Sequence, residues 1–156
     1  MRARGLSIIE ILMVVSIMAL LLSLISPAYH YFQVSTRLNE DTAQLIQAIR
    51  LARQRSIAGY NGQVHGLWLE SNSGLDRYVL YQGASFAARN VSYDRVVWLT
   101  NNVDWSFTDL TLTNDDVDIN FSTSTGTPDN LGIIHVNYGG SLRNVVINSA
   151  GLIEMN

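Results

Sequence analysis

The sequence contains no cysteine and no lysine, and it has only two prolines in 156 residues. Without cysteine, the chain forms no disulfide, no thiolate metal site and no thiol nucleophile. A domain exported from the cell would therefore depend on core packing and hydrogen bonds alone. The missing cysteine does not identify a compartment, because disulfides are permitted outside the cell but are not required there.

All ten basic residues are arginines, and thirteen acidic residues oppose them. From Val91 onward only Arg95 and Arg143 are basic, whereas eight residues in that part of the chain are Asp or Glu. A protein that binds a phosphate backbone needs clustered Lys and Arg. The acidic distal half therefore makes nucleic acid an unlikely partner.

The common catalytic and metal-binding motifs are also missing. There is no G-x-S-x-G turn and no P-loop, and His30, His65 and His135 stand apart without metal-ligand spacing. Residues 114–120, Asn-Asp-Asp-Val-Asp-Ile-Asn, offer oxygen ligands of the kind that Ca²⁺ takes. They lack the glycine and the distal glutamate of an EF-hand loop, so we favour a solvated turn entering a strand. The sequence predicts neither an enzyme nor a bound cofactor.

A long apolar run, residues 6–26, follows Arg2 and Arg4 and contains a single charge, Glu10. As a helix it would span about 31 Å, close to the roughly 30 Å of a bilayer's hydrocarbon core. The two arginines would hold the start of the chain in the cytoplasm. Three alternatives fit less well. A cleaved signal peptide has a shorter apolar core, a plain anchor gains nothing from Glu10, and a buried core helix would lack partners in so small a domain.

Glu10 is the informative residue of this run. A carboxylate within a membrane costs roughly 2.5–3.5 kcal/mol on insertion scales and usually has a partner. Cleavage after Gly5 would create one, because the α-amino group of Leu6 would then be free on every copy of the chain. Glu10 of one copy could pair with that amine on a neighbour when the helices pack side by side.

The residues around Glu10 read Arg4-Gly5-Leu6-Ser7-Ile8-Ile9-Glu10, and an apolar helix and Pro27 follow. This arrangement resembles the prepilin signature of type IV pilins and type II secretion pseudopilins. The resemblance implies that prepilin peptidase cleaves after Gly5 and methylates the new N-terminus at Leu6. It also implies that Glu10 aids assembly and that the helix loosens at Pro27 in the filament.

Pro27 lacks a backbone N–H and is expected to kink or open the helix at residues 23–27. Beyond it, a helical pattern resumes. Its apolar stripe consists of Leu38, Thr42, Leu45, Ile49, Ala52 and Ser56. The sequence therefore predicts one long helix over about residues 6–58, capped by Gly59. Arg50, Arg53 and Arg55 near its end are read as favouring the negative end of the helix dipole and solvating the exposed face, rather than as an anion site.

After Gly59 the helical period disappears and short β-type runs alternate with turn residues. Tyr138-Gly139-Gly140-Ser141 suits a hairpin. The expected strands are residues 63–70, 77–82, 96–99, 110–113, 117–121, 132–138, 143–148 and 152–155. The predicted class is α+β: a long N-terminal helix, membrane-spanning in its first half, packed on one antiparallel β-sheet or on two packed sheets. Trp68, Trp98 and Trp105 are expected in core and sheet-face packing rather than on an adhesive surface.

The expected domains are a leader at residues 1–5, a transmembrane and assembly helix at 6–27, an amphipathic helix at 28–58 and a β-rich globular domain at 59–156. Within the pilin family, the helix end and the closing hairpin look most like H-type minor pseudopilins and FimT-like minor pilins. Some FimT-like proteins bind DNA through a basic C-terminal region, but residues 152–156 contain no arginine.

The sequence thus predicts a structural subunit of a type IV pilus or a type II secretion pseudopilus. Its expected partners are prepilin peptidase, other pilin or pseudopilin subunits, the inner-membrane assembly platform and, before assembly, membrane lipid. The expected location is the inner membrane, with the N-terminus in the cytoplasm, and then an extracytoplasmic or cell-surface filament. The alternative is a membrane-anchored binding module, either a DNA receptor or an adhesin.

Overall fold

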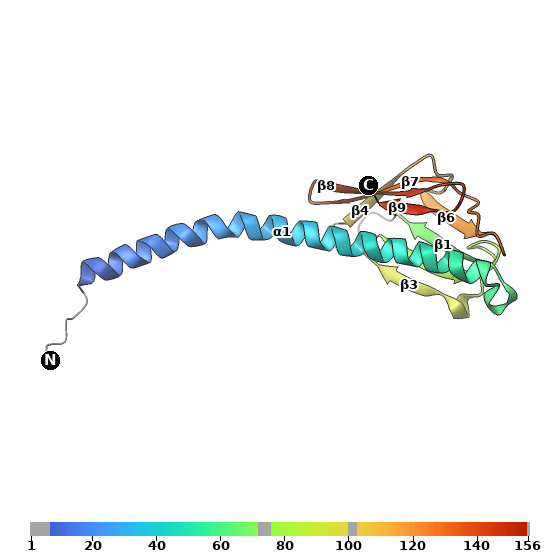
Figure 1. Cartoon of the computed structure of the whole chain (residues 1–156), viewed down its shortest axis with the longest axis horizontal. Coiled ribbons are helices and arrows are strands. Elements are labelled where there is room, and N and C mark those ends of the chain that lie inside the picture. Colours follow the sequence, from blue (N-terminus) through green and yellow to red (C-terminus); the bar gives the residue numbers. More distant parts are fainter. Residues whose placement is uncertain (1–6, 72–75, 100–102, 156) are drawn as a thin grey trace. The chain divides into compact units, whose positions relative to one another are not determined.

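A computed structural model describes residues 7–71, 76–99 and 103–155, without the side chains of residues 24–28 and 30 (Figure 1). The chain divides into two compact units, Met1–Ser35 and Thr36–Asn156. One helix, α1 (Ile8–Ile57), contributes to both. Among the described residues, no helical stretch has the length and the hydropathy that a bilayer crossing requires.

We expected a kink or a local opening of the helix before Pro27. The backbone is helical throughout residues 23–27, so the opening is wrong for the isolated chain, whereas the kink stays a prediction. The physical reason is that proline removes one backbone donor, its own, while the neighbouring residues still continue the helix. The other end behaves as expected. Gly59 has φ 59° and ψ 36°, the left-handed conformation that glycine adopts easily, and its N–H donates to the carbonyl of Ser56 over 3.1 Å.

The predicted apolar stripe is the face of α1 that enters the core of Thr36–Asn156. All six of its members are at most 1% exposed: Leu38, Thr42, Leu45, Ile49, Ala52 and Ser56. The two hydroxyls on this face are satisfied. Thr42 Oγ1 donates to the carbonyl of Leu38 over 2.7 Å, and Ser56 Oγ accepts from the N–H of His65 over 2.8 Å. The stripe therefore buries its polar atoms without leaving them unpaired.

The described strands of this unit form two antiparallel sheets, and the predicted α+β class with antiparallel sheets is confirmed. The first sheet has the order β3-β2-β1-β6-β5, with β1 (His65–Glu70), β2 (Arg77–Gln82), β3 (Arg95–Trp98), β5 (Leu112–Thr113) and β6 (Asp116–Phe121). The second has the order β4-β7-β8-β9, with β4 (Val103–Thr108), β7 (Gly132–Tyr138), β8 (Ser141–Ile147) and β9 (Ile153–Met155). Two 3₁₀ turns, η1 (Tyr60–Gly62) and η2 (Val91–Tyr93), lie outside the sheets.

The two sheets and α1 share one hydrophobic core. Alternate residues of the strands point into it, for example Leu67 and Leu69 of β1 and Ile134 and Val136 of β7, all of them at most 1% exposed. This period of two is what a sheet with one buried face requires. Of the nine strands in the described part of the chain, eight lie where the sequence predicts them, and β4 is the one that the sequence reading missed.

Two tight hairpins have the turn chemistry that their sequences suggest. Tyr138 pairs with Ser141, and between them Gly139 and Gly140 have φ 56° and 80°. Thr113 pairs with Asp116 across two residues that also have positive φ, 54° and 69°. Two consecutive left-handed residues are the mark of a type I′ turn, which suits the twist of the flanking strands.

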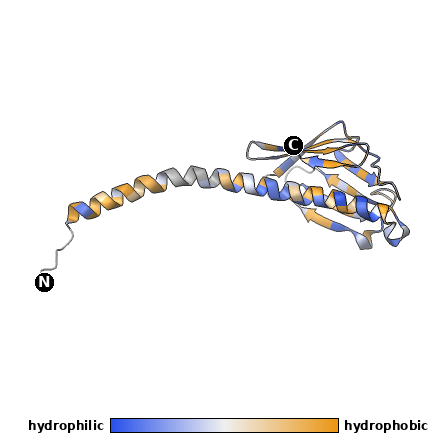
Figure 2. Ribbon diagram, viewed as in Figure 1, coloured by the Kyte–Doolittle hydropathy of each residue, from blue (hydrophilic) through white to orange (hydrophobic). Residues whose placement is uncertain are grey.

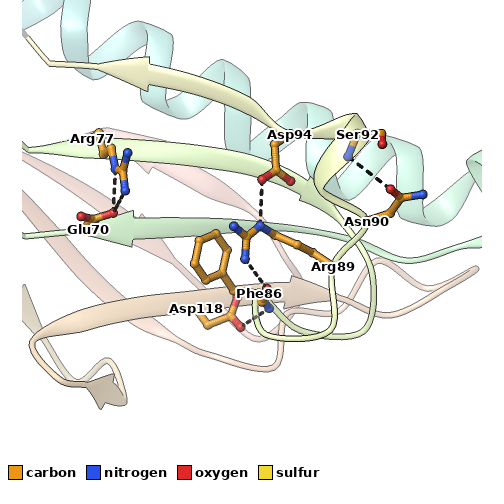
Figure 3. A network of polar contacts seen from close by, with 8 residues as sticks. All are labelled: Glu70, Arg77, Phe86, Arg89, Asn90, Ser92, Asp94 and Asp118. Atoms are coloured by element: carbon orange, nitrogen blue, oxygen red, sulfur yellow. Dashed lines mark hydrogen bonds and ion pairs between the residues drawn. The ribbon is translucent and has the colours of Figure 1, made fainter.

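The connection from β2 to β3 is held on the face of the first sheet that points away from the core (Figure 3). Asp118 of β6 accepts hydrogen bonds from the hydroxyl of Tyr81 and from the N–H of Phe86. The ring of Phe86 stacks on Trp68 with 4.4 Å between centroids. The guanidinium carbon of Arg89 also lies over the Phe86 ring, 3.7 Å from its centroid. The connection is therefore a well-anchored part of the fold.

Candidate functional site

The first described turns of α1 expose an unusual amount of apolar surface. Every large hydrophobic residue between positions 8 and 22 is 52–79% exposed: Ile8, Ile9, Ile11, Leu12, Met13, Val14, Val15, Ile17, Met18, Leu20, Leu21 and Leu22. At 100° per residue these side chains lie on all sides of the helix. Figure 2 shows the same stretch as mostly hydrophobic, in contrast to the mixed pattern toward the end of α1. A surface of this kind marks a site of interaction with protein or lipid.

Glu10 is the acidic residue in the first turn of this segment. Its Oε2 accepts a hydrogen bond from the backbone N–H of Ser7 over 3.0 Å. Ser7 in turn offers its hydroxyl to the N–H of Ile9 over 3.4 Å and its carbonyl to the N–H of Glu10 over 3.0 Å. The two side chains thus satisfy backbone donors that the start of a helix leaves free, in a variant of the capping box in which the serine hydroxyl accepts from the second helical N–H, that of Ile9, instead of the third.

The capping role of Glu10 was not part of the sequence reading, although its signal is visible there. A serine followed three residues later by a glutamate, directly before an apolar run, is the sequence pattern of a capping box. The carboxylate is also at the positive end of the helix dipole, where a negative charge is favourable. In the isolated chain Glu10 therefore has an intramolecular partner of its own.

The other predicted site residues are described only in part. Gly5 and Leu6, the expected processing and methylation positions, lie outside the described residues. Pro27 lies within α1, and its side chain is outside the description. Of the four predicted positions, the structure thus places the side chain of Glu10, together with the Ser7 donor that it binds.

The three arginines near the end of α1 lie where the sequence predicts them, with Arg55 in the last turn and Arg50 exposed, and they also make contacts that the sequence did not predict. Arg50 Nη2 donates to the carbonyl of Ile153 over 2.9 Å. Arg53 donates from Nε to the carbonyl of Gly126 and from Nη2 to that of Ala150, over 3.1 Å in both cases. Arg55 lies over the ring of Tyr60, 5.5 Å from its centroid. Arg50 and Arg53 therefore tie the helix to distant segments of the same unit: Arg50 to strand β9, and Arg53 to the turns at Gly126 and Ala150.

The acidic stretch at residues 114–120 forms the two-residue turn of the hairpin described above and most of β6, and Asp116 and Asp118 have different hydrogen-bond partners. Asp116 accepts from the N–H of Ser71 over 2.9 Å, whereas Asp118 binds Tyr81 and Phe86. Burial raises the pKa of Asp116, and the Ser71 N–H opposes that rise. No group of three or more acidic or histidine side chains within the described ranges is placed to hold a metal ion.

The histidines and tryptophans are dispersed as well. His65 is 2% exposed, and burial together with the nearby Arg55 charge lowers its pKa. His135 lies between Thr108 and Asn144, with ring nitrogens 2.9 and 2.8 Å from their side-chain oxygens. Trp105 is buried, as expected, but Trp98 is 55% exposed, so the expectation of packing holds for only part of the set.

Comparison with known proteins adds no relative to this description: no protein-family model, no curated protein and no solved structure matches the chain.

Proposed function

We propose that the chain is a non-enzymatic structural subunit of a type IV pilus or a type II secretion pseudopilus. One observation carries the proposal. Glu10 lies one turn into a helical segment whose large apolar side chains are exposed on every side, and the sequence Arg4-Gly5-Leu6 stands directly before it. An apolar surface alone fits any membrane anchor. A carboxylate at this point next to a cleavable glycine fits a segment that also packs against copies of itself.

The exposed apolar segment is buried both before and after assembly. Burying the twelve side chains, each now 52–79% exposed, is favourable by on the order of 10–20 kcal/mol. Membrane lipid covers them before assembly, over the full sequence run of residues 6–26. In the fibre, neighbouring helices replace the lipid, so this surface passes from one apolar environment to another without entering water.

Processing gives Glu10 its partner in the fibre. Prepilin peptidase removes residues 1–5 on the cytoplasmic side and methylates the amine of Leu6. Glu10 then leaves its own Ser7 N–H and pairs with the amine of a neighbouring subunit on the assembly platform. A desolvated pair of this kind contributes little net stability, but it forms in only one stagger of the two helices. Its function is therefore to set the register of assembly.

The rival function, a DNA receptor on a membrane anchor, finds less support in the contacts. Two of the arginines that could track phosphates, Arg50 and Arg53, already donate to backbone carbonyls of their own unit. Freeing them for phosphate would break these three hydrogen bonds. The acidic distal half adds repulsion.

Co-expression with an active or an inactive prepilin peptidase tests the proposal. With the active enzyme, the membrane-bound chain is expected to lose residues 1–5, as intact mass and N-terminal sequencing would show. The Gly5→Leu variant is the matched control and is expected to keep its leader. A wild-type chain that stays whole beside active peptidase, with salt-sensitive binding to DNA, would favour the anchored receptor instead.

A further inference from the structure

The chain contains two Asn-x-Ser triplets, Asn90-Val91-Ser92 and Asn120-Phe121-Ser122. This pattern is the acceptor sequence for N-linked glycans, which are bulky, solubilising groups on protein surfaces. A three-residue pattern recurs by chance, so it does not make a site by itself. The structure separates the two triplets, because an acceptor asparagine must be exposed and its amide nitrogen must be free to react.

The triplet at Asn120 is inaccessible. Asn120 lies within β6 and is 7% exposed, and Phe121 beside it is fully buried. The side-chain nitrogen Nδ2 of Asn120 donates to the hydroxyl of Tyr81 over 3.0 Å and to the carbonyl of Gly83 over 2.9 Å. An amide nitrogen has two protons to donate, and here both have partners inside the fold. A glycan could be attached to Asn120 only if β6 left the sheet.

The triplet at Asn90 has the opposite environment. Asn90 caps the 3₁₀ turn η2, and both Asn90 and Ser92 are exposed. The side-chain oxygen Oδ1 of Asn90 accepts a hydrogen bond from the N–H of Ser92 over 3.2 Å (Figure 3). This local turn engages the oxygen of the side-chain amide. Its nitrogen, Nδ2, donates to no residue within the described ranges, so the atom that would carry a glycan is available.

The turn that presents Asn90 is fixed to the sheet and closed on itself. The N–H of Asn90 donates to the carbonyl of Gln82, the last residue of β2, over 2.9 Å. On either side of the triplet, Arg89 Nε and Asp94 Oδ2 form an ion pair over 2.8 Å (Figure 3). An acceptor that is already ordered loses less conformational freedom when an enzyme binds it. The triplet is therefore both exposed and held in one conformation.

Exposed apolar side chains lie next to the acceptor in the sequence. Val91 and Tyr93 are 66% and 51% exposed. A glycan on Asn90 would shield them from water. Strand β3 begins two residues after Tyr93 and is an edge strand of the first sheet. A bulky group beside an edge strand also hinders pairing with the strand of another chain. A glycan at this position would therefore keep the β-rich unit soluble.

We propose that Asn90 is an acceptor of an N-linked glycan and that Asn120 is not. In the transfer, Nδ2 of Asn90 forms a bond to the anomeric carbon of a glycan carried on a lipid pyrophosphate. The bond between that carbon and the pyrophosphate oxygen breaks, and the lipid pyrophosphate leaves with the electron pair. Nδ2 releases one proton to a base of the transferase. Use of the site in the cell rests on the proposed function, which places this unit outside the cytoplasm, where exported proteins receive such glycans.

An oligosaccharyltransferase that needs only the three-residue triplet tests the site on the full chain in dodecyl maltoside micelles, with a lipid-linked oligosaccharide as the donor. The intact mass is expected to rise by one glycan, and peptide mapping is expected to place it on Asn90. Transfer to Asn90 is expected to be at least about tenfold faster than to Asn120, which must first break two side-chain hydrogen bonds. Unfolded peptides of residues 86–96 and 116–126 are both expected to accept the glycan.

Variants of the two triplets are the matched controls. Ser92→Ala is expected to abolish the transfer and Ser92→Thr to keep it, whereas Ser122→Ala is expected to leave the gain in mass unchanged. The proposal would be overturned by a folded chain that gains no glycan, by equal rates at the two asparagines, or by a gain in mass that persists in Asn90→Gln. The chain in this experiment still carries residues 1–5, so none of these results bears on whether it is processed and assembled into a fibre.

Discussion

Replacing Glu10 by glutamine and by alanine separates two roles of its carboxylate. In the isolated chain Oε2 accepts the hydrogen bond from the N–H of Ser7 over 3.0 Å. In the proposed fibre it pairs with the amine of a neighbouring Leu6. Glutamine keeps an oxygen that can accept from Ser7, and it is found in capping boxes alongside glutamate, but it has no charge. Alanine removes both functions.

The two roles differ in magnitude. Loss of one capping side chain costs about 1 kcal/mol of helix stability. Breaking a desolvated ion pair and leaving the other charge unpaired costs about 3–5 kcal/mol, which is a factor of more than about a hundred in an equilibrium constant. If pairing in the fibre is the main role, Glu10→Gln and Glu10→Ala lower incorporation by about a hundredfold or more. They then differ from each other by about tenfold at most.

Quantitative mass spectrometry of sheared fibres, relative to the membrane fraction of the same cells, measures this incorporation. The membrane fraction is the control, because both variants are expected to insert normally. The reasoning would be refuted by a Glu10→Gln chain that enters fibres like the wild type while Glu10→Ala does not. That result would make Glu10 a helix cap and nothing more.

Three further predictions concern Thr36–Asn156, and urea unfolding followed by tryptophan fluorescence tests each. Arg53→Gln is expected to lower the free energy of unfolding by about 1–2 kcal/mol, since it loses its bonds to two carbonyls. Arg55→Gln loses the ring contact with Tyr60 and is expected to lower the free energy of unfolding by less. An equal loss of stability in the two variants would contradict this assignment of roles. Gly66→Ala is expected to cost about 1–3 kcal/mol because its Cβ would overlap the phenol of Tyr81, and a variant as stable as the wild type would exclude that close approach. Because burial lowers the pKa of His65 in the folded state, the unfolded state binds the proton more readily, and stability should fall as the pH drops below about 6.5. His65→Gln is expected to make stability depend less on pH in this range. An unchanged pH dependence in the variant would mean that other groups cause it.

The parts of the fold that follow from local pattern were predictable. The buried stripe of α1 repeats at three and four residues, and two adjacent glycines, Gly139 and Gly140, indicate the hairpin turn. Each feature therefore depends on residues close in sequence. The strand β4 was missed, although Val103, Trp105 and Phe107 alternate with polar residues as a half-buried strand requires.

The contacts that join distant segments could not be read from the sequence. Arg53 binds carbonyls 73 and 97 residues further along the chain, and no periodicity indicates such a pairing. The capping box of Ser7 and Glu10 is the opposite case: it is local, and the sequence reading passed over it because the carboxylate was considered only as a partner for another subunit.

The central claim is that the apolar segment of α1, freed at Leu6, builds a fibre from many copies of processed chains. Intact-mass and N-terminal analysis of protein sheared from the cell surface tests it most directly. The account predicts that this chain is present in the fibres, that it begins at Leu6, and that its N-terminal amine is methylated. Fibres that lack the chain, or a chain that still carries residues 1–5 where prepilin peptidase is active, would contradict it.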